Sequence, residues 1–381
     1  RIFRLYVAAV AAINAAILIS PGVAKMKFSL SIDMSRLDPS VDMREVARNT
    51  MEIVQMADEG GFEMVWAAEH HAIEMTIAPN PFQLLAWYGG NTDNIRLGVA
   101  VVQAPYWHPI KVAGEAGLLD LMSGGRLELA LGRGAYQREF DRMMGGMDQH
   151  KGVAYMQEML PLLKELWAGD CTHDGELWQF PASTACPKPL QTPHPPLWVA
   201  ARHPSTYDWA LKHGCNIMSW ALTRPFSEVV KYKEQFDEAL ERSPGVERPR
   251  FLTMRHTAVY ADAEEGWKPF TDSMQRSGLQ FESLFKQLGE IKNGFVEIPD
   301  SDSLDNSTEY DPKMLKDNLV FGTPDEVIAK LRPYDDLGVD NFLYRCCTGL
   351  SFEHQKESLR LFINEVMPAF RDSRYVAQAA E

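Results

Sequence analysis

Short apolar runs alternate along this chain with segments in which apolar residues recur at helical spacing. Eight runs have the length of strands: 27–32, 63–68, 95–102, 127–131, 197–201, 216–220, 250–260 and 341–345. Segments with the period of amphipathic helices lie between or after them, at 81–88, 109–122, 153–167, 226–240, 324–331 and 352–366. Strands that alternate with helices in this way predict parallel βα units.

This order of elements predicts a (β/α)8 TIM barrel with insertions at the C-terminal face of the strands. An open doubly wound sheet can produce the same alternation, but the Gly-x-Gly-x-x-Gly fingerprint of such sheets does not follow the first strand. We expect one barrel domain over residues 26–375 and a tail at 376–381. The polar stretch 169–195 predicts a small hairpin near Asp174, and the acidic segment 289–312 predicts a mobile insertion.

Residues 1–25 do not fit the βα pattern. Arg1 and Arg4 precede an apolar run and a small-residue exit at 20–24, which is the organisation of a signal peptide. The alternative is a mis-called N-terminal extension of a chain that begins at Met26. We exclude this segment from the fold and expect a cytoplasmic protein, while a secreted or anchored form stays open.

The charge balance and the cysteines exclude some classes of function. Acidic residues outnumber basic ones, 52 against 38, and the formal net charge is −14. We expect no nucleic-acid partner, because phosphate backbones are bound by clustered Lys and Arg. The five cysteines are odd in number and lack Cys-x-x-Cys spacing, so neither a disulfide framework nor a metal site is predicted.

Polar residues follow several predicted strands, at the barrel face where active sites lie. His70 and His71 follow the second strand, and only one of them can face the barrel mouth because successive side chains point to opposite sides. A structural role for this pair stays open. Arg133 follows the fourth strand between two glycines, which let a ligand approach while the guanidinium contacts a phosphate. A tight turn with a surface arginine is the alternative.

The fifth predicted strand ends at Ala201 and Arg202, and Ser205 and Thr206 then open a helix. Hydroxyl groups and the amides of a helix start can bind an anion. Simple capping of the helix by His203 or Ser205 explains the same residues. This second strand end therefore favours a phosphate without requiring one.

Aromatic side chains fall near the same strand ends, at Trp107, Tyr136 and Trp220. Two anion-friendly strand ends, a histidine and aromatic walls together indicate a planar, phosphorylated cofactor. The residue pattern alone supports no more than a barrel enzyme with an anionic ligand.

Three blocks of the sequence resemble the bacterial luciferase family of flavin-dependent monooxygenases. They are VWAAEHH at 65–71, HPIKVAGEAGLLDLMSGGRLELALGRGAYQREF at 108–140 and PLWVAARHPSTYDWALKHGCNIMSW at 196–220. The FGTPDEVIAKL run at 321–331 is also similar. By this resemblance His70 is the catalytic histidine, Arg133 and Tyr136 lie near the flavin, and its phosphate lies at Ser205 and Thr206.

Two departures from luciferase bear on function. Arg202 stands where luciferase has an acidic residue, and Gly132 stands where it has a reactive cysteine. We therefore expect no light emission, and we add Arg202 and the neighbouring Ala201 to the expected cofactor-binding residues. Trp107 and Trp220 are expected in the substrate pocket. The resemblance also implies a non-proline cis peptide near the end of the third strand, which the sequence does not locate.

The resemblance implies the chemistry as well. FMN would arrive reduced from a partner NAD(P)H reductase and react with dioxygen at flavin C4a, and the resulting peroxyflavin would oxygenate a small organic substrate. The segment 280–312 would close over the site and exclude water. Family members commonly form dimers, so a homodimer or heterodimer is expected.

Three alternatives stay open from the sequence. A deazaflavin-dependent hydride-transfer oxidoreductase on the same fold would reduce its substrate without oxygen. A non-catalytic flavin-binding protein would bind FMN without substrate-dependent oxygen uptake. A membrane-tethered partner protein would depend on residues 1–25.

Overall fold

The computed structural model describes residues 26–287, 289–297, 310–346 and 348–371. Eight parallel strands in these ranges form a closed barrel, because β8 pairs with β9 as well as with β7. Around the barrel they are β9 (Phe251–Val259), β13 (Asn341–Arg345), β1 (Lys27–Ser31), β2 (Met64–Ala67), β3 (Arg96–Gln103), β4 (Leu127–Gly132), β7 (Leu197–Ala200) and β8 (Asn216–Trp220). The predicted TIM barrel is confirmed. The expected leader at 1–25 and the whole of the expected tail at 376–381 lie outside the described residues.

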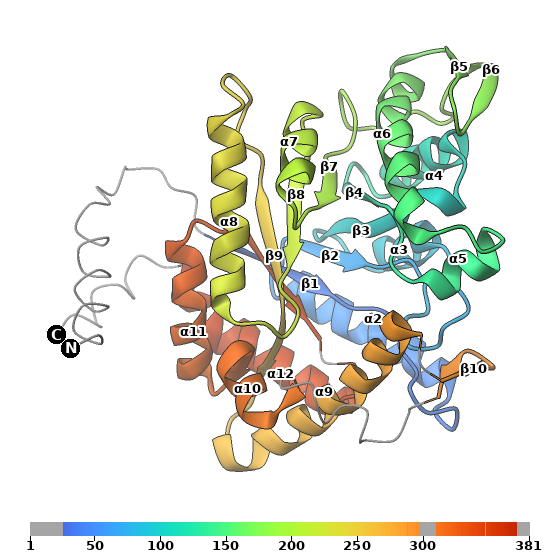
Figure 1. Cartoon of the computed structure of the whole chain (residues 1–381). Coiled ribbons are helices and arrows are strands. Elements are labelled where there is room, and N and C mark those ends of the chain that lie inside the picture. Colours follow the sequence, from blue (N-terminus) through green and yellow to red (C-terminus); the bar gives the residue numbers. More distant parts are fainter. Residues whose placement is uncertain (1–25, 288, 298–309, 347, 372–381) are drawn as a thin grey trace.

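Helices cover the outside of the barrel, with α8 and α11 on one flank and α4 and α6 on the other (Figure 1). The main ones are α2 (Met43–Glu59), α3 (Pro81–Gly89), α4 (Pro109–Met122), α6 (Gly152–Ala168), α7 (Pro204–Lys212), α8 (Phe226–Glu241), α11 (Pro324–Asp336) and α12 (Phe352–Leu361). The predicted helix 352–366 is α12 continued by a π-helical turn, Phe362–Val366, before α13 (Pro368–Arg371). Among the described helices, none is long and apolar enough to span a bilayer.

The chain has further short helices and strands, and the long helix α9, in addition to the eight βα units of the barrel. They are η1 (Ala104–Tyr106), α5 (Gln137–Met143), η2 (Gln149–Lys151), β5 (Cys171–Asp174), β6 (Gln179–Ser183), α9 (Ala263–Lys286), β10 (Ile291–Lys292), β11 (Phe295–Val296), α10 (Pro312–Asn318) and β12 (Val320–Gly322). β5 and β6 form the hairpin predicted near Asp174. Of the predicted insertion 289–312, the structure describes the β10–β11 hairpin and the start of α10, while 298–309 lie outside it.

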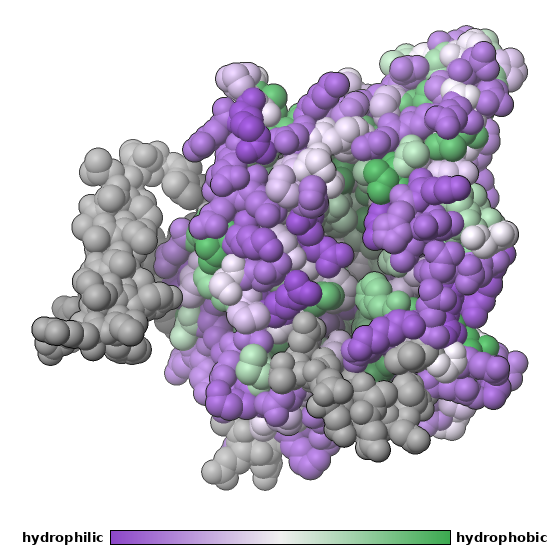
Figure 2. All heavy atoms as spheres, in the orientation of Figure 1, coloured by the Kyte–Doolittle hydropathy of each residue, from purple (hydrophilic) through white to green (hydrophobic). Residues whose placement is uncertain are grey.

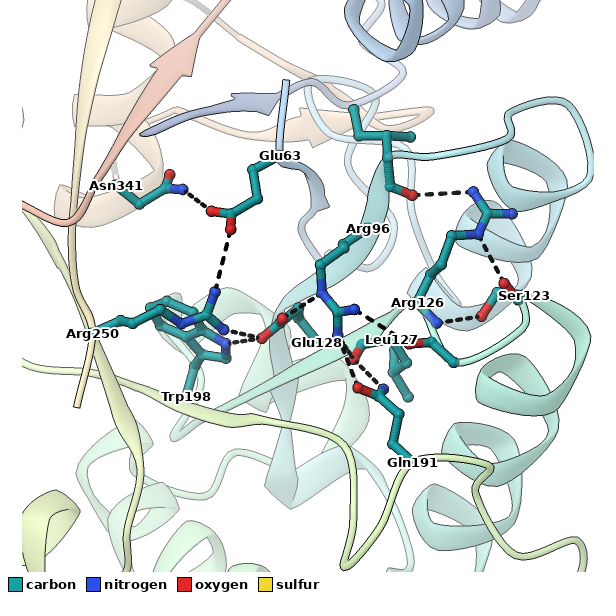
Figure 3. A network of polar contacts seen from close by, with 12 residues as sticks. Glu63, Arg96, Ser123, Arg126, Leu127, Glu128, Gln191, Trp198, Arg250 and Asn341 are labelled. Carbon is teal, nitrogen blue, oxygen red and sulfur yellow. Dashed lines mark hydrogen bonds and ion pairs between the residues drawn. The ribbon is translucent and has the colours of Figure 1, made fainter. Parts of the chain in front are cut away.

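A buried carboxylate closes the floor of the barrel, at the N-terminal ends of the strands (Figure 3). Glu128 on β4 is 1 % exposed and accepts hydrogen bonds from Arg96 Nε at 2.6 Å and Arg250 Nη2 at 2.8 Å. The indole Nε1 of Trp198 donates to the same carboxylate at 2.6 Å. These charges satisfy one another, as buried charges must. The N-terminal end of the barrel is thus closed by paired charges, which leaves the opposite end for a ligand.

Candidate functional site

A cavity of about 230 Å³ lies at the C-terminal end of the barrel strands, and we call it the central cavity. Its wall is made by inward-facing strand residues and by the loops that follow them: Ser31, Asp33, Trp66, Ala68, His70, Thr76, Ala100, Val101, Tyr136, Ala200, Ala201, Arg202, Met218, Ser219, Trp220, Leu252, Met254, Phe281, Leu343 and Arg345. The molecular surface is hollowed between α8 and α6, and hydrophobic side chains are visible in the hollow (Figure 2). The active-site face of the barrel therefore contains a largely apolar cavity.

His70 lies on the wall of the central cavity, directly after β2. The side chain of His71 makes a different contact, since its Nε2 lies 2.7 Å from Glu69 Oε1. Only His70 of this pair is among the residues that line the cavity, in agreement with the alternation of side chains along an extended segment.

A buried carboxylate from α5 holds His70 in place. Glu139 is 0 % exposed, and both of its carboxylate oxygens lie 3.2 Å from His70 Nδ1. Because Nδ1 is hydrogen-bonded to Glu139, Nε2 is the ring nitrogen that can contact a ligand in the cavity. Burial opposes the charged imidazole, but the charge and hydrogen bond of Glu139 outweigh it, so the pKa of His70 is raised.

Tyr136 packs against the ring of His70. The two ring centroids are 4.9 Å apart, with an interplanar angle of 31°. Burial, and next the negative charge of Glu139, raises the pKa of Tyr136 far above its ordinary value. The phenol therefore stays protonated and can donate a hydrogen bond into the cavity. Phe285 of α9 packs against it at 5.0 Å between centroids.

Glu69 organises the loop behind His70, and Trp107 belongs to this loop rather than to the cavity. The Glu69 carboxylate is 1 % exposed and accepts hydrogen bonds from the Gln103 amide at 2.8 Å and Trp107 Nε1 at 2.9 Å. Trp107 packs on Phe82 and is absent from the residues that line the central cavity. The structure does not bring Trp107 to the expected substrate pocket.

Arg202, on the wall of the central cavity, and the nearby Arg133 have no carboxylate partner in an ion pair among the described residues. Arg133 follows β4 and Arg202 follows β7, and neither makes an ion pair within the described part of the chain. Burial, and then repulsion by Arg202, lowers the pKa of Arg133. Two neighbouring cations that repel each other form a site for an anion, because the anion removes the repulsion and accepts their hydrogen bonds.

Ser205 and Thr206 lie beside this pair, in the first turn of α7. His203 caps the helix: its Nδ1 accepts from the Ser205 amide at 3.4 Å and lies 2.9 Å from Ser205 Oγ. The Thr206 amide donates to the His203 carbonyl at 2.9 Å. The capping alternative therefore describes the local structure. Because the cap occupies the amides of Ser205 and Thr206, the side-chain hydroxyls of these two residues are the groups that remain for contact with a phosphate.

Small residues form part of the wall of the central cavity. Ala100 and Val101 of β3 are joined by a cis peptide bond, and both line the cavity. The adjoining Gly132 has no room for a side chain, because a Cβ there would lie 2.3 Å from Val101 Cγ2. The departure from luciferase at Gly132 thus has a steric reason in this chain.

Three residues on the cavity wall carry hydrogen-bond donors that lack a partner. They are Trp66 Nε1, Trp220 Nε1 and Arg345 Nε. Unsatisfied buried donors are uncommon and suggest a ligand with acceptor atoms. A flavin has ring carbonyls for such donors, a planar ring that can pack on Ala100 and Val101, and a phosphate for Arg133 and Arg202. The residues of the site therefore fit FMN.

The structure brings most of the predicted site residues together. His70, Tyr136, Ala201, Arg202 and Trp220 line the central cavity. Arg133, Ser205 and Thr206 are not among the lining residues and follow the adjacent strands β4 and β7.

Sequence reasoning missed Glu139 and the buried ion pair between Arg345 and Asp33, 2.6 Å apart. Asp33 and Arg345 stand at the ends of the first and eighth strands, so the strand-end rule could have found them. Glu139 stands three residues after Tyr136, one helical turn away.

Comparisons with known proteins agree with this site. The family model of luciferase-like monooxygenases matches residues 26–341. The chain is 41 % identical over 349 residues to the oxygenase component of the flavin-dependent trigonelline monooxygenase of Acinetobacter baylyi, covering 92 % of this chain and 97 % of the relative.

Two solved structures have the same fold. The monooxygenase RslO1 from Streptomyces bottropensis superposes with a TM-score of 0.77 at 23 % identity, covering 91 % of this chain and 100 % of the other. The oxygenating constituent of the 3,6-diketocamphane monooxygenase of Pseudomonas putida, a type II Baeyer–Villiger monooxygenase in complex with FMN, has a TM-score of 0.74 at 19 % identity. That match covers 90 % of this chain and 98 % of the other.

Proposed function

The chain belongs to the luciferase-like monooxygenase family and is a flavin-dependent monooxygenase, and we propose that it takes reduced FMN from a separate reductase and uses dioxygen to oxygenate a small N-heteroaromatic acid. The relative from Acinetobacter baylyi is named as the oxygenase component of such a system, which supports the separate reductase. An enzyme that depends on NAD(P)H through its partner belongs in the cytoplasm, and we propose that location.

One observation carries the choice of FMN: Arg202 lines the central cavity, Arg133 lies close enough for the two charges to repel each other, and neither has an ion-pair partner among the described residues. The phosphate of FMN supplies the missing negative charge, and the hydroxyls of Ser205 and Thr206 add hydrogen bonds. Riboflavin, which lacks the phosphate, should therefore bind far more weakly than FMN.

Different residues of the chain bind the cofactor, exclude water and transfer a proton. When bound, the reduced flavin supplies the electrons that activate dioxygen. Arg133 and Arg202 fix the cofactor phosphate, while apolar strand residues and Phe281 keep water out of the cavity. His70 holds or donates a proton at Nε2, and its raised pKa keeps the protonated form to higher pH than in an ordinary imidazole.

The substrate class is proposed from the relative and from the lining of the cavity. Trigonelline, named for the relative, is a methylated pyridinium carboxylate, so it carries both charges on one aromatic ring. Aromatic side chains of Tyr136, Trp220 and Phe281 line the central cavity and can pack on a cationic ring. Both signs of charge are present on the wall, at Asp33 and Arg345.

The test is oxygen uptake with photoreduced FMN and N-methylnicotinate, with product and hydrogen peroxide measured together. We expect substrate-dependent product formation by the wild type. The FMN affinity of His70→Ala should stay within a few fold of the wild-type value. This variant should divert oxygen to hydrogen peroxide, because it lacks the imidazole that holds or donates a proton in the cavity. Anaerobic reduction of the substrate by a reduced deazaflavin would support hydride transfer instead, and FMN binding without substrate-dependent uptake would support a non-catalytic role.

We further propose a homodimer formed through α4. Three apolar side chains of this helix are exposed at helical spacing: Leu118 by 44 %, Leu121 by 50 % and Met122 by 64 %. Such a stripe on an outer barrel helix is typical of a protein interface.

A further inference from the structure

A second cavity of about 350 Å³ adjoins the central cavity, and we call it the side chamber. The two cavities share Trp220 and Phe281, whose ring centroids lie 6.3 Å apart. The side chamber lies between β8, the loop after it, β9 and the inner face of α9, and its principal residues are Trp220, Leu222, His256, Met274, Phe281 and Phe285.

The central cavity is too small for two organic ligands. Its volume of about 230 Å³ is below the range of about 300–1,000 Å³ that ligand pockets usually have. A flavin ring in this cavity leaves the substrate to an adjoining space. The side chamber is such a space, and so is an open groove of about 940 Å³ that shares Ser31, Asp33 and Arg345 with the central cavity.

The linings of these two spaces differ in chemistry. Many charged residues line the open groove, including Arg36, Asp38, Glu45 and Arg276, as is typical of a solvated surface. The side chamber has mainly aromatic and aliphatic walls, and its lining also includes Arg224 and the paired charges of Glu282 and Lys286. Its polar groups include His256, which is 3 % exposed and whose Nδ1 has no hydrogen-bond partner.

The charges around His256 favour an anion. Burial, and then the positive charges of Arg345 and Arg255, lowers the pKa of His256 to about 3. The imidazole is therefore neutral at working pH and has one N–H to donate, with two buried arginines nearby. Trp220 Nε1, also without a partner, is a second donor on the same wall.

Arg255 anchors the loop that forms one wall of the side chamber. Its side chain is 0 % exposed and has no carboxylate partner among the described residues. Its Nη1 donates to the carbonyls of Leu222 at 3.1 Å and Arg224 at 2.7 Å. These bonds fix the loop after β8, in which Leu222 has a positive φ of 54°. The wall that faces His256 is therefore held in one conformation.

We propose that the side chamber holds the organic substrate and that His256 and Trp220 donate hydrogen bonds to its carboxylate, an inference that rests on the proposed function. The substrate ring then packs against Trp220 and Phe281, at the boundary with the central cavity. His256 is on this account a specificity-determining residue, which selects acids over uncharged or purely cationic rings.

The test compares N-methylnicotinate with N-methylpyridinium, which has the same cationic ring and no carboxylate. Binding of each to the protein loaded with oxidised FMN is measured by calorimetry, and KM is measured in the oxygen assay. His256→Leu should weaken N-methylnicotinate roughly 10- to 100-fold, the usual effect of losing a hydrogen bond to a charged group. It should leave the FMN affinity and the N-methylpyridinium affinity unchanged. His256→Asn, which keeps an N–H donor, should restore part of the loss.

Arg276→Ala, in the open groove, is the matched control and should change neither affinity. Wild-type turnover with an unchanged KM in His256→Leu, or a loss confined to Arg276→Ala, overturns the side chamber as the substrate site and leaves the proposed function standing. Carboxylate-selective binding that depends on His256 but leads to no turnover supports the side chamber and overturns the proposed substrate class. Absence of any binding by the wild type overturns both.

Discussion

Replacing Gly152 by alanine should weaken FMN binding without touching the cofactor site directly. Gly152 is the first residue of α6 and is buried against the segment that follows β4. A Cβ at this position would lie 1.9 Å from the carbonyl oxygen of Arg133 and 2.9 Å from its carbonyl carbon. Ordinary contact begins near 3.4 Å, so the two backbones must separate by about 1.5 Å. Neither side of this contact is a flexible side chain.

The displacement acts on Arg133, which the account places at the FMN phosphate. A shift of this size breaks a charge-assisted hydrogen bond, worth about 1.5–3 kcal/mol, and therefore weakens Kd by roughly 10- to 150-fold. The assay is titration of FMN by protein fluorescence, repeated with riboflavin. Since riboflavin has no phosphate, its weaker binding should change much less.

Gly169→Ala is the matched control, at the other end of the same helix. Gly169 has an extended φ of 179°, and a Cβ there meets nothing within 4 Å. This variant should bind FMN as the wild type does. In an Arg133→Ala background, Gly152→Ala should add little further loss, because the two changes remove the same interaction. FMN binding by Gly152→Ala within twofold of Gly169→Ala, or a full effect of Gly152→Ala in the Arg133→Ala background, would contradict this role of Arg133.

Three further predictions follow from buried contacts and exposed apolar side chains. Glu139→Gln removes the charge that raises the pKa of His70, so burial then lowers that pKa. The protonated imidazole exists below the pKa and is therefore lost at a lower pH in this variant. As a result, the yield of product per oxygen consumed should fall at a lower pH than in the wild type. Glu128→Gln should destabilise the fold by about 3 kcal/mol in urea unfolding, because it breaks the buried ion pairs of the barrel floor, while the Kd for FMN stays unchanged; equal stability would contradict this role. The double variant Leu121→Glu with Met122→Glu should elute as a monomer in size-exclusion chromatography, and a dimer that persists would exclude α4 as the interface.

The barrel could be predicted because its strands are buried on both faces and so appear as continuous apolar runs. Helix α4 has the predicted bounds, 109–122, since proline opens it and a Ser-Gly-Gly turn follows it. Strand β12 was not predicted, because its three residues, Val320–Gly322, are too few to show a period. Its pairing with β9 depends on tertiary contact alone.

The site was only partly predictable for a related reason. His70 and Arg202 follow strands directly, so the topology of the barrel carries both to the same face. His256 lies inside the long strand β9, where nothing in the local sequence distinguishes it from a core residue. Trp107 follows a strand end as well, but its indole N–H is bonded to Glu69 and its ring packs on Phe82. Which strand-end side chains turn inward depends on such partners, which are distant in sequence.

The most direct test of the central claim is a crystal structure of the protein with FMN. The account predicts the phosphate within hydrogen-bond distance of Arg133 and Arg202, and the ring in the central cavity against Ala100 and Val101, beside His70. A phosphate bound away from both arginines, or a ring outside this cavity, would contradict it.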